Sequence, residues 1–232
     1  MRCMDFVIEQ EQRLINSIHN ILVAVAETVE VLEVACLCHF DVKFNATNLI
    51  SLPRLKELTT HYSFALRQTI FEPCHQLRRM HIVQSRRSDL FGGIRDVAPS
   101  LTHLRFSGLP QEVDFGVMLE ALGIREEPPR PTQGLPVAML PSSMQKIIVK
   151  PSSPPARAEW GGAKAKLYWA LMAQLHHLNE KEDRFVLLKG QDDAIHSNSD
   201  WLDRIVGKGG HWRFDDSDVI QRKGIIPKED KW

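Results

Sequence analysis

The chain has 232 residues, of which 43% are hydrophobic and 25% are charged, so it can bury a substantial core and is most simply one domain. Lysine and arginine together number 29, the same as aspartate and glutamate, which argues against a general binder of nucleic acid or membrane surfaces because such proteins usually carry a basic excess. Its apolar runs are shorter than the roughly 18 residues that a membrane-spanning helix needs.

The first predicted element is an amphipathic helix over about residues 6–29. Its apolar residues recur at helical intervals, as in Leu14, Ile18, Ile21 and Val25. Because a repeat array needs a capping element at each end, we expect this helix to cover the open end of the array that follows, or to be the outer helix of its first unit.

Short apolar phrases with one common spacing follow this helix. In the clearest copy the first, fourth and sixth residues are Leu101, Leu104 and Phe106. The same spacing recurs at Leu32/Ala35/Leu37, Leu55/Leu58/Thr60, Leu77/Met80/Ile82 and Met144/Ile147/Val149. The first four copies start roughly 23 residues apart and the last interval is about twice as long, and a period in the twenties with this spacing is typical of a leucine-rich repeat.

The spacing has a structural cause. In a short strand the fourth and sixth residues point to the same side, into the core, while the third and fifth point to the other side. Stacked units would share that core, with their strands paired in parallel. We therefore predict an α/β fold: a leucine-rich-repeat-like curved solenoid with strands on its concave side, helices on its convex side, and strands over residues 31–38, 56–61, 78–83, 102–107 and 146–150.

Beyond residue 150 the pattern changes. Residues 163–178 predict a helix with Leu167, Leu171, Leu175 and Leu178 on one side, and the apolar run at residues 185–188 predicts one more buried parallel strand. A capping box at Ser197 predicts a short helix that covers the last sheet edge. The expected division is an array with its N-terminal capping helix over residues 1–150, a helix-strand-helix cap of the same domain over residues 151–212, and a flexible tail over residues 213–232.

Several stretches resemble the leucine-rich-repeat portion of fungal F-box-like proteins, over roughly residues 21–212. They include Leu52-Pro-Arg-Leu-Lys-Glu-Leu58, Leu140-Pro-Ser-Ser-Met-Gln-Lys-Ile-Ile-Val149 and Asp183-Arg-Phe-Val-Leu-Leu188. The resemblance implies a curved repeat domain that holds a substrate or partner near a ubiquitin ligase. The F-box itself, which docks the ligase adaptor, is not seen in this sequence, so an adaptor is expected as a partner only if an F-box lies upstream.

The candidate binding residues are polar side chains on the predicted concave face. This face is mildly basic, which favours an acidic or phosphorylated segment of a protein partner through charge-assisted hydrogen bonds. The alternative is an ordinary solvated sheet face, but curved repeat domains commonly bind on the concave side. The predicted partner-binding residues are His61, Arg79, His81, His103, Arg105, Lys146 and Lys150.

Metal and catalytic sites are not predicted. Cys36 and Cys38 with His61 and His81 offer zinc-ligand chemistry, but C-x-C is not the usual chelating spacing. The sequence contains no G-x-S-x-G, G-x-x-x-x-G-K-[ST] or H-E-x-x-H motif. We therefore expect no metal, no cofactor and no catalytic residues.

The expected function is a non-catalytic protein–protein interaction domain, similar to the partner-binding repeat region of F-box-like ubiquitin-ligase receptors. The alternatives are a truncated version of a complete F-box substrate receptor, or a hydrolase that uses scattered Ser, His and Asp residues, for which His211 is the residue to test. The four cysteines form no disulfide-like framework, and acidic residues interrupt the N-terminus where a signal peptide would lie. We expect an intracellular monomer, cytoplasmic or nuclear, that binds neither nucleic acid nor membrane.

Overall fold

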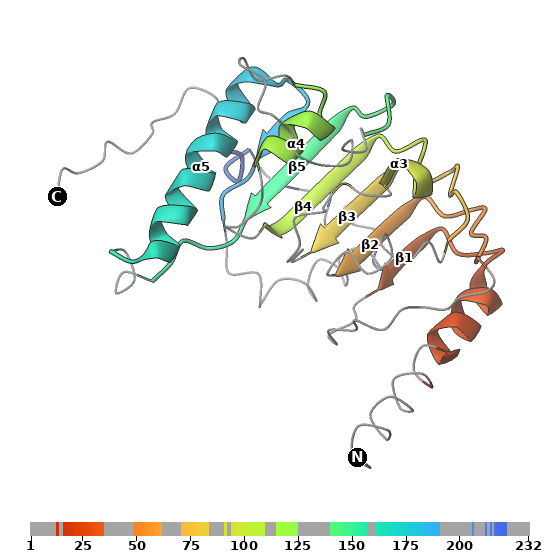
Figure 1. The fold of residues 1–232 in the computed structure, drawn as a ribbon. Helices are drawn as coiled ribbons and strands as arrows, with labels where there is room; N and C mark the ends of the chain where they lie inside the picture. The colour runs from red at the N-terminus through yellow and green to blue at the C-terminus, as the bar shows by residue number, and fades with distance from the viewer. Residues whose placement is uncertain are drawn as a thin grey trace, which may run out of the picture.

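Six parallel strands form one sheet in the computed structural model. The structure describes residues 13, 16–34, 49–61, 71–83, 91, 94–109, 115–124, 140–156, 161–190, 206, 212, 214 and 216–221. The strands lie side by side in chain order and point the same way (Figure 1). They are β1 (Val31–Val34), β2 (Glu57–His61), β3 (Arg79–Val83), β4 (His103–Leu109), β5 (Lys146–Pro151) and β6 (Phe185–Leu187). The predicted α/β class and parallel pairing are confirmed.

One apolar residue from each strand contributes to a continuous row across the sheet. Successive members are Cα partners in the strand register, and all except the first, which is partly buried, are buried in one core cluster. The row consists of Leu32, Leu58, Met80, Leu104, Ile147 and Phe185. The apolar phrases from residue 55 onward therefore align in the predicted register, with their fourth residues side by side.

The first phrase was predicted three residues too late. Leu32 pairs with Leu58 and not with the leading Leu55, so the first copy is Val29/Leu32/Val34. The main-chain oxygen of Glu30 accepts hydrogen bonds from the N–H groups of Lys56 at 2.8 Å and Glu57 at 3.1 Å, and this double contact sets the register. The predicted core residue Leu37 lies outside the described residues.

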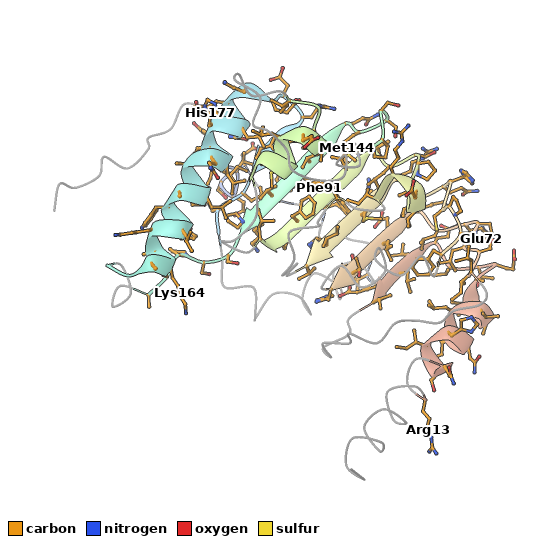
Figure 2. The ribbon with its side chains drawn as sticks, in the orientation of Figure 1. Arg13, Glu72, Phe91, Met144, Lys164 and His177 are labelled. Atoms are coloured by element: carbon orange, nitrogen blue, oxygen red, sulfur yellow. The ribbon has the colours of Figure 1, made fainter. Side chains whose placement is uncertain are left out.

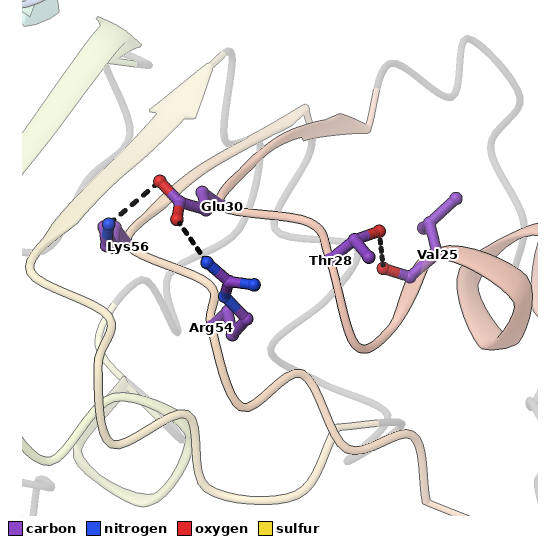
Figure 3. Close-up of polar contacts among 5 residues, drawn as sticks. All are labelled: Val25, Thr28, Glu30, Arg54 and Lys56. Atoms are coloured by element: carbon purple, nitrogen blue, oxygen red, sulfur yellow. Dashed lines mark hydrogen bonds and ion pairs between the residues drawn. The ribbon is translucent and has the colours of Figure 1, made fainter.

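Side-chain contacts support the same junction. The carboxylate of Glu30 accepts hydrogen bonds from Lys56 Nζ at 2.9 Å and Arg54 Nη2 at 3.2 Å (Figure 3). These contacts, led by the hydrogen bond from Lys56, hold the pKa of Glu30 below its ordinary value. Because the three side chains are exposed to solvent, we ascribe the register to the main-chain bonds rather than to the ion pairs.

A tight turn precedes each of the strands β2 to β5. The leading residue of the phrase donates its N–H to the carbonyl oxygen three residues earlier: Leu55 to Leu52 at 3.2 Å, Leu77 to Cys74 at 3.0 Å, Leu101 to Ala98 at 3.1 Å and Met144 to Pro141 at 3.1 Å. The two residues that each of these hydrogen bonds joins are both buried. The leading apolar residue of each of these phrases therefore fills space at the approach to its strand.

The helices pack on the core face of the sheet. Residues of α3 (Ile94–Val97), α4 (Phe115–Ala121) and α5 (Ala163–Lys181) belong to the same buried cluster as the apolar row. Phe91 contacts Phe106 edge to face with ring centroids 5.5 Å apart, and it lies over the middle of the sheet (Figure 2). The N-terminal helical residues 16–25 add Leu22 to this core.

Helix α5 buries a different stripe at its start from the one predicted. Leu171, Leu175 and Leu178 are buried as expected, but Leu167 is 47% exposed and Tyr168 is buried in its place. Both sets of positions fit one helix face, but the buried face also includes Ala165 and Asn179, and its centre therefore lies nearer Tyr168 than Leu167. The prediction for Leu167 was therefore wrong.

Neighbouring connections between strands are also joined by main-chain bonds. Glu72 donates its N–H to the carbonyl oxygen of Ile50 at 3.0 Å, and Cys74 donates to that of Val97 at 2.7 Å. Within the connection between β4 and β5, Leu140 donates to Ala121 at 3.1 Å. Successive units are thus bonded both along the sheet and along their returning segments.

The predicted sixth strand is confirmed as β6, and a C-terminal segment pairs with its end. Val219 forms an antiparallel bridge with Leu188, and Ile220 donates its N–H to the carbonyl oxygen of Leu187 at 2.8 Å. The helix expected to cover this edge, which begins near Ser197, lies outside the described residues. Residues 213–232 were expected as a flexible tail, but within them residues 218–220 are bonded to the main chain of residues 187–189.

Thr60 is the one polar residue in the apolar positions of β2, and it provides a test of the core. It is 0% exposed and its hydroxyl has no hydrogen-bond partner. Burial of the hydroxyl therefore costs about 1–3 kcal/mol of desolvation that no hydrogen bond offsets. We expect Thr60→Val to raise the free energy of unfolding by about 1 kcal/mol, measured by urea denaturation. The control is the exposed Thr28→Val variant, which loses the hydrogen bond from its hydroxyl to the carbonyl oxygen of Val25 at 3.2 Å and should not gain stability. An unchanged or lower stability for Thr60→Val would contradict the assignment.

Candidate functional site

The side chains between the core residues point to the second face of the sheet and form three rows. The first row, at the strand starts, contains Glu57, Arg79, His103 and Lys146, which are successive Cα partners. We call Arg79, His103 and Lys146 the basic row. The middle row is Thr59, His81, Arg105, Ile148 and Val186, and the last row is His61, Val83, Ser107 and Lys150.

All seven sequence-predicted site residues lie on this second face. Arg79, His103 and Lys146 occupy the first row, His81 and Arg105 the middle row, and His61 and Lys150 the last row. Parity along each strand is sufficient to place them there. Their role in partner binding remains a prediction.

The middle and last rows are buried except for Val186, which is partly exposed. His81 is 2% exposed and Arg105 is 5% exposed, and the side chains of His61 and Lys150 are also buried. The basic row, in contrast, keeps partial exposure in all three residues. Within the described part of the second face, the basic row is therefore more accessible to a partner than the rows behind it on the same strands.

A buried polar group connects β3 and β4. His81 Nε2 lies 2.9 Å from Ser107 Oγ, and Arg105 Nε donates to the same oxygen at 3.4 Å. A serine beside an imidazole is one half of a nucleophilic arrangement. Ser107 is only 4% exposed, however, and its oxygen also accepts the hydrogen bond from Arg105. The geometry thus favours a structural link between strands over attack on a substrate.

Acidic residues of β1 and β2 balance part of the positive charge. Glu57 Oε1 accepts a hydrogen bond from Arg79 Nη1 at 2.9 Å. Glu33 Oε1 lies 3.5 Å from His61 Nε2, which is close enough for an ion pair with a protonated imidazole. Charge on the second face therefore runs from acidic at β1 and β2 to basic at β4 and β5.

Two aromatic residues from the C-terminal segment lie against the basic row. The guanidinium carbon of Arg79 is 5.8 Å from the ring centroid of Trp212, and the ring of His103 meets that indole edge to face at 6.3 Å. Lys146 Nζ is 5.0 Å from the ring centroid of Phe214. Neither Trp212 nor Phe214 was predicted as part of the site, because no pattern near them in the sequence indicates which strands they contact.

His103 is held in its neutral form. Burial lowers its pKa first, and the positive charges of Arg79 and Lys146 lower it further. Its Nδ1 atom lies 2.9 Å from Thr102 Oγ1, which fixes the ring at the start of β4. The basic row at neutral pH therefore presents two permanent cations with a neutral imidazole between them.

A separate open pocket of about 450 Å³ lies beside α3, α4 and the turn before β5. Its charged lining residues are Arg95 and Arg184. Arg184 is already bound to Glu182, through Nε to Oε1 at 2.8 Å and Nη2 to Oε2 at 3.0 Å. The rest of the lining is mainly apolar and includes Leu122 and Leu140.

Across the described residues, no group of three or more His, Cys, Asp or Glu side chains is placed to hold a metal ion. Cys36 and Cys38, the two thiols with zinc-ligand chemistry, lie outside the described part of the chain. None of the helices that the structure describes is both long enough and apolar enough to cross a membrane.

Comparison of the chain with protein-family models, with curated proteins and with solved structures finds no match. The α/β class with its parallel sheet is shown by the structure. The leucine-rich-repeat assignment and the function stay predictions.

The environment of His103 predicts how its pKa responds to a change in its neighbours. Lys146→Met removes one of the charges that lower this pKa, so the pKa should rise toward the ordinary value. The measurement is an NMR titration of the His103 ring protons. The control is Lys164→Met at the start of α5, which should leave the His103 titration as in the unmodified chain. An unchanged pKa in Lys146→Met would contradict the coupling.

The same shift fixes a sign for stability against pH. A histidine whose pKa is lower when folded binds protons less readily in the folded state than in the unfolded state. The stability that His103 contributes to the folded state is therefore fully present above about pH 6.5, and it declines as the pH falls below that value. We expect the stability lost between pH 7 and pH 5 to be smaller in His103→Gln than in the unmodified chain, measured by urea denaturation at both pH values.

Proposed function

We propose that the chain is a leucine-rich-repeat-type domain that binds a protein partner, without catalysis, through the basic row on its concave face. The observation that carries the proposal is the partial exposure of Arg79, His103 and Lys146, whereas the rows behind them are buried. These residues come from three adjoining strands of one sheet, so they form a fixed recognition surface and not a mobile one.

Three features support the repeat-type assignment. The apolar phrase recurs at a period in the twenties, a hydrogen-bonded turn precedes each of the strands β2 to β5, and neighbouring returns are bonded to one another. Each unit therefore contacts mainly the units before and after it, as in a solenoid. With strands on one side and returning segments on the other, the second face corresponds to the concave side.

Charge and spacing support an acidic or phosphorylated segment as the partner. Side chains in one row of a parallel sheet are separated by about 4.8 Å per strand. An extended segment that crosses the strands could place successive carboxylate or phosphate oxygens near Arg79 and Lys146. Because the carboxylate of Glu57 already neutralises part of the charge of Arg79, Lys146 should attract an incoming anion more strongly than Arg79 does.

The resemblance to fungal F-box-like proteins supports a more specific version of the same function. On that resemblance the concave face would hold a substrate for a ubiquitin ligase, and the ligase adaptor would bind a separate F-box module. Both versions use the same face, so one binding experiment tests their shared part.

The test is direct binding of acidic and phosphorylated peptides to the purified chain, followed by fluorescence polarisation. Arg79→Glu combined with Lys146→Glu should weaken binding at least ten-fold, which corresponds to about 1.4 kcal/mol. Raising the salt concentration should also weaken binding, because the attraction is between exposed charges.

The matched control reverses two exposed lysines outside the basic row, Lys164→Glu and Lys166→Glu at the start of α5. It should bind as the unmodified chain does, and circular dichroism should show both variants folded. Equal loss in both variants, or no loss in either, would rule out the basic row as the binding surface.

A further inference from the structure

A C-terminal segment contacts the basic row through two aromatic side chains. We call residues 212–220 the strap, of which the structure describes residues 212, 214 and 216–220. Trp212 lies against Arg79 and His103, at the starts of β3 and β4, and Phe214 lies against Lys146, at the start of β5. Its described residues therefore meet the strands in order, and the strap crosses the sheet from β3 to β6.

The spacing of the two aromatic residues matches the spacing of the strands. Neighbouring strands lie about 4.8 Å apart, and two residues of chain span at most about 7 Å. The main chain at Trp212 is 3₁₀-helical and not extended, but two residues separated by one are still far enough apart to contact adjoining strands. Trp212 and Phe214 do so at the same time.

The two ends of the strap are held differently. Near β6 the main chain is bonded on both sides of Val219: Lys189 donates its N–H to the carbonyl oxygen of Asp218 at 2.8 Å, and Asn179 Nδ2 donates to that of Ile220 at 3.2 Å. Trp212 and Phe214, in contrast, meet the basic row through side-chain contacts. Contacts of a cation with an aromatic ring at exposed sites change an equilibrium by only roughly two- to five-fold each.

We propose that the basic row recognises a peptide with two aromatic residues spaced by one and followed by carboxylates, and that the strap is a built-in copy of this ligand. The sequence Trp212-Arg-Phe214-Asp-Asp216 provides the pattern. This inference rests on the proposed function, since it names the partner of the same row. An incoming segment displaces Trp212 and Phe214 from the cations, while residues 218–220 stay paired with the end of β6.

Charge complementarity supports this partner chemistry. The cations of Arg79 and Lys146 attract both the faces of aromatic rings and the carboxylates that follow them. His103, held neutral, provides a ring edge for an indole without adding a charge to be desolvated. A partner with acidic residues alone would satisfy the charges but not the ring contacts.

The experiment uses the full chain and a fluorescein-labelled peptide with the sequence of residues 210–218. Trp212→Ala combined with Phe214→Ala opens the row, and this variant should bind the peptide at least ten-fold more tightly than the unmodified chain. Adding Arg79→Gln and Lys146→Gln to the opened variant should abolish that gain. A peptide with both aromatic residues replaced by Ala should bind at least ten-fold more weakly. Equal affinity of the opened and unmodified chains would overturn the proposal.

A second measurement covers the case in which the opened variant fails to fold. Excess peptide added to the unmodified chain should move the NMR signal of the Trp212 indole N–H to its solvent-exposed position. The amide of Ile220 should keep its protection from hydrogen exchange, because the paired end stays bound. A Trp212 signal that does not move at saturating peptide would overturn the proposal.

The outcomes separate this inference from the proposed function. If acidic or phosphorylated peptides without aromatic residues bind the basic row and the aromatic peptide does not, the inference fails alone. If neither kind of peptide binds, the proposed function fails with it.

Discussion

One carbonyl oxygen in each unit holds the structure in register. The main-chain oxygens of Glu30, Lys56, Arg78 and Thr102 each accept two N–H groups from the start of the next unit, at distances between 2.8 and 3.1 Å. Two donors on one acceptor leave the following strand a single way to align, because a shift of one residue would exchange its core and outer faces. The buried apolar row and the basic row are both consequences of this contact, which sets them on opposite sides of the sheet.

The sequence was sufficient for the centre of the sheet and insufficient at its first strand. From residue 55 onward, apolar positions recur with one spacing, and only one alignment buries Leu58, Met80 and Leu104 together. Residues 29–37 are apolar at too many places for spacing alone to choose a register, and the choice depends on a hydrogen bond between residues 26 positions apart, Glu30 and Lys56. In the same way, the helical period on α5 fits Leu167 and Tyr168 equally well with the leucines that follow, and Tyr168 is the one on the side of the buried Ala165 and Asn179.

The candidate site shows the same division between local and distant information. Alternation along each strand placed the seven predicted side chains on the correct face, but alternation cannot tell what lies over that face. The contact between Arg79 and Trp212 joins residues far apart in the chain, and no pattern near either residue predicts it. Burial of His81 and Arg105 was missed for this reason: polar and charged side chains are usually exposed, and here they form a covered network around Ser107.

The antiparallel bridge between Leu188 and Val219 closes one end of the sheet to further parallel strands. An additional parallel unit cannot extend the end of β6 where a strand of opposite polarity already occupies its hydrogen-bonding groups. Duplication of units in related chains would therefore lengthen this sheet from within and leave its closing segment in place. The long interval between β4 and β5, where one connection spans nearly two periods, is the position at which the chain could accommodate such an added unit with least disturbance.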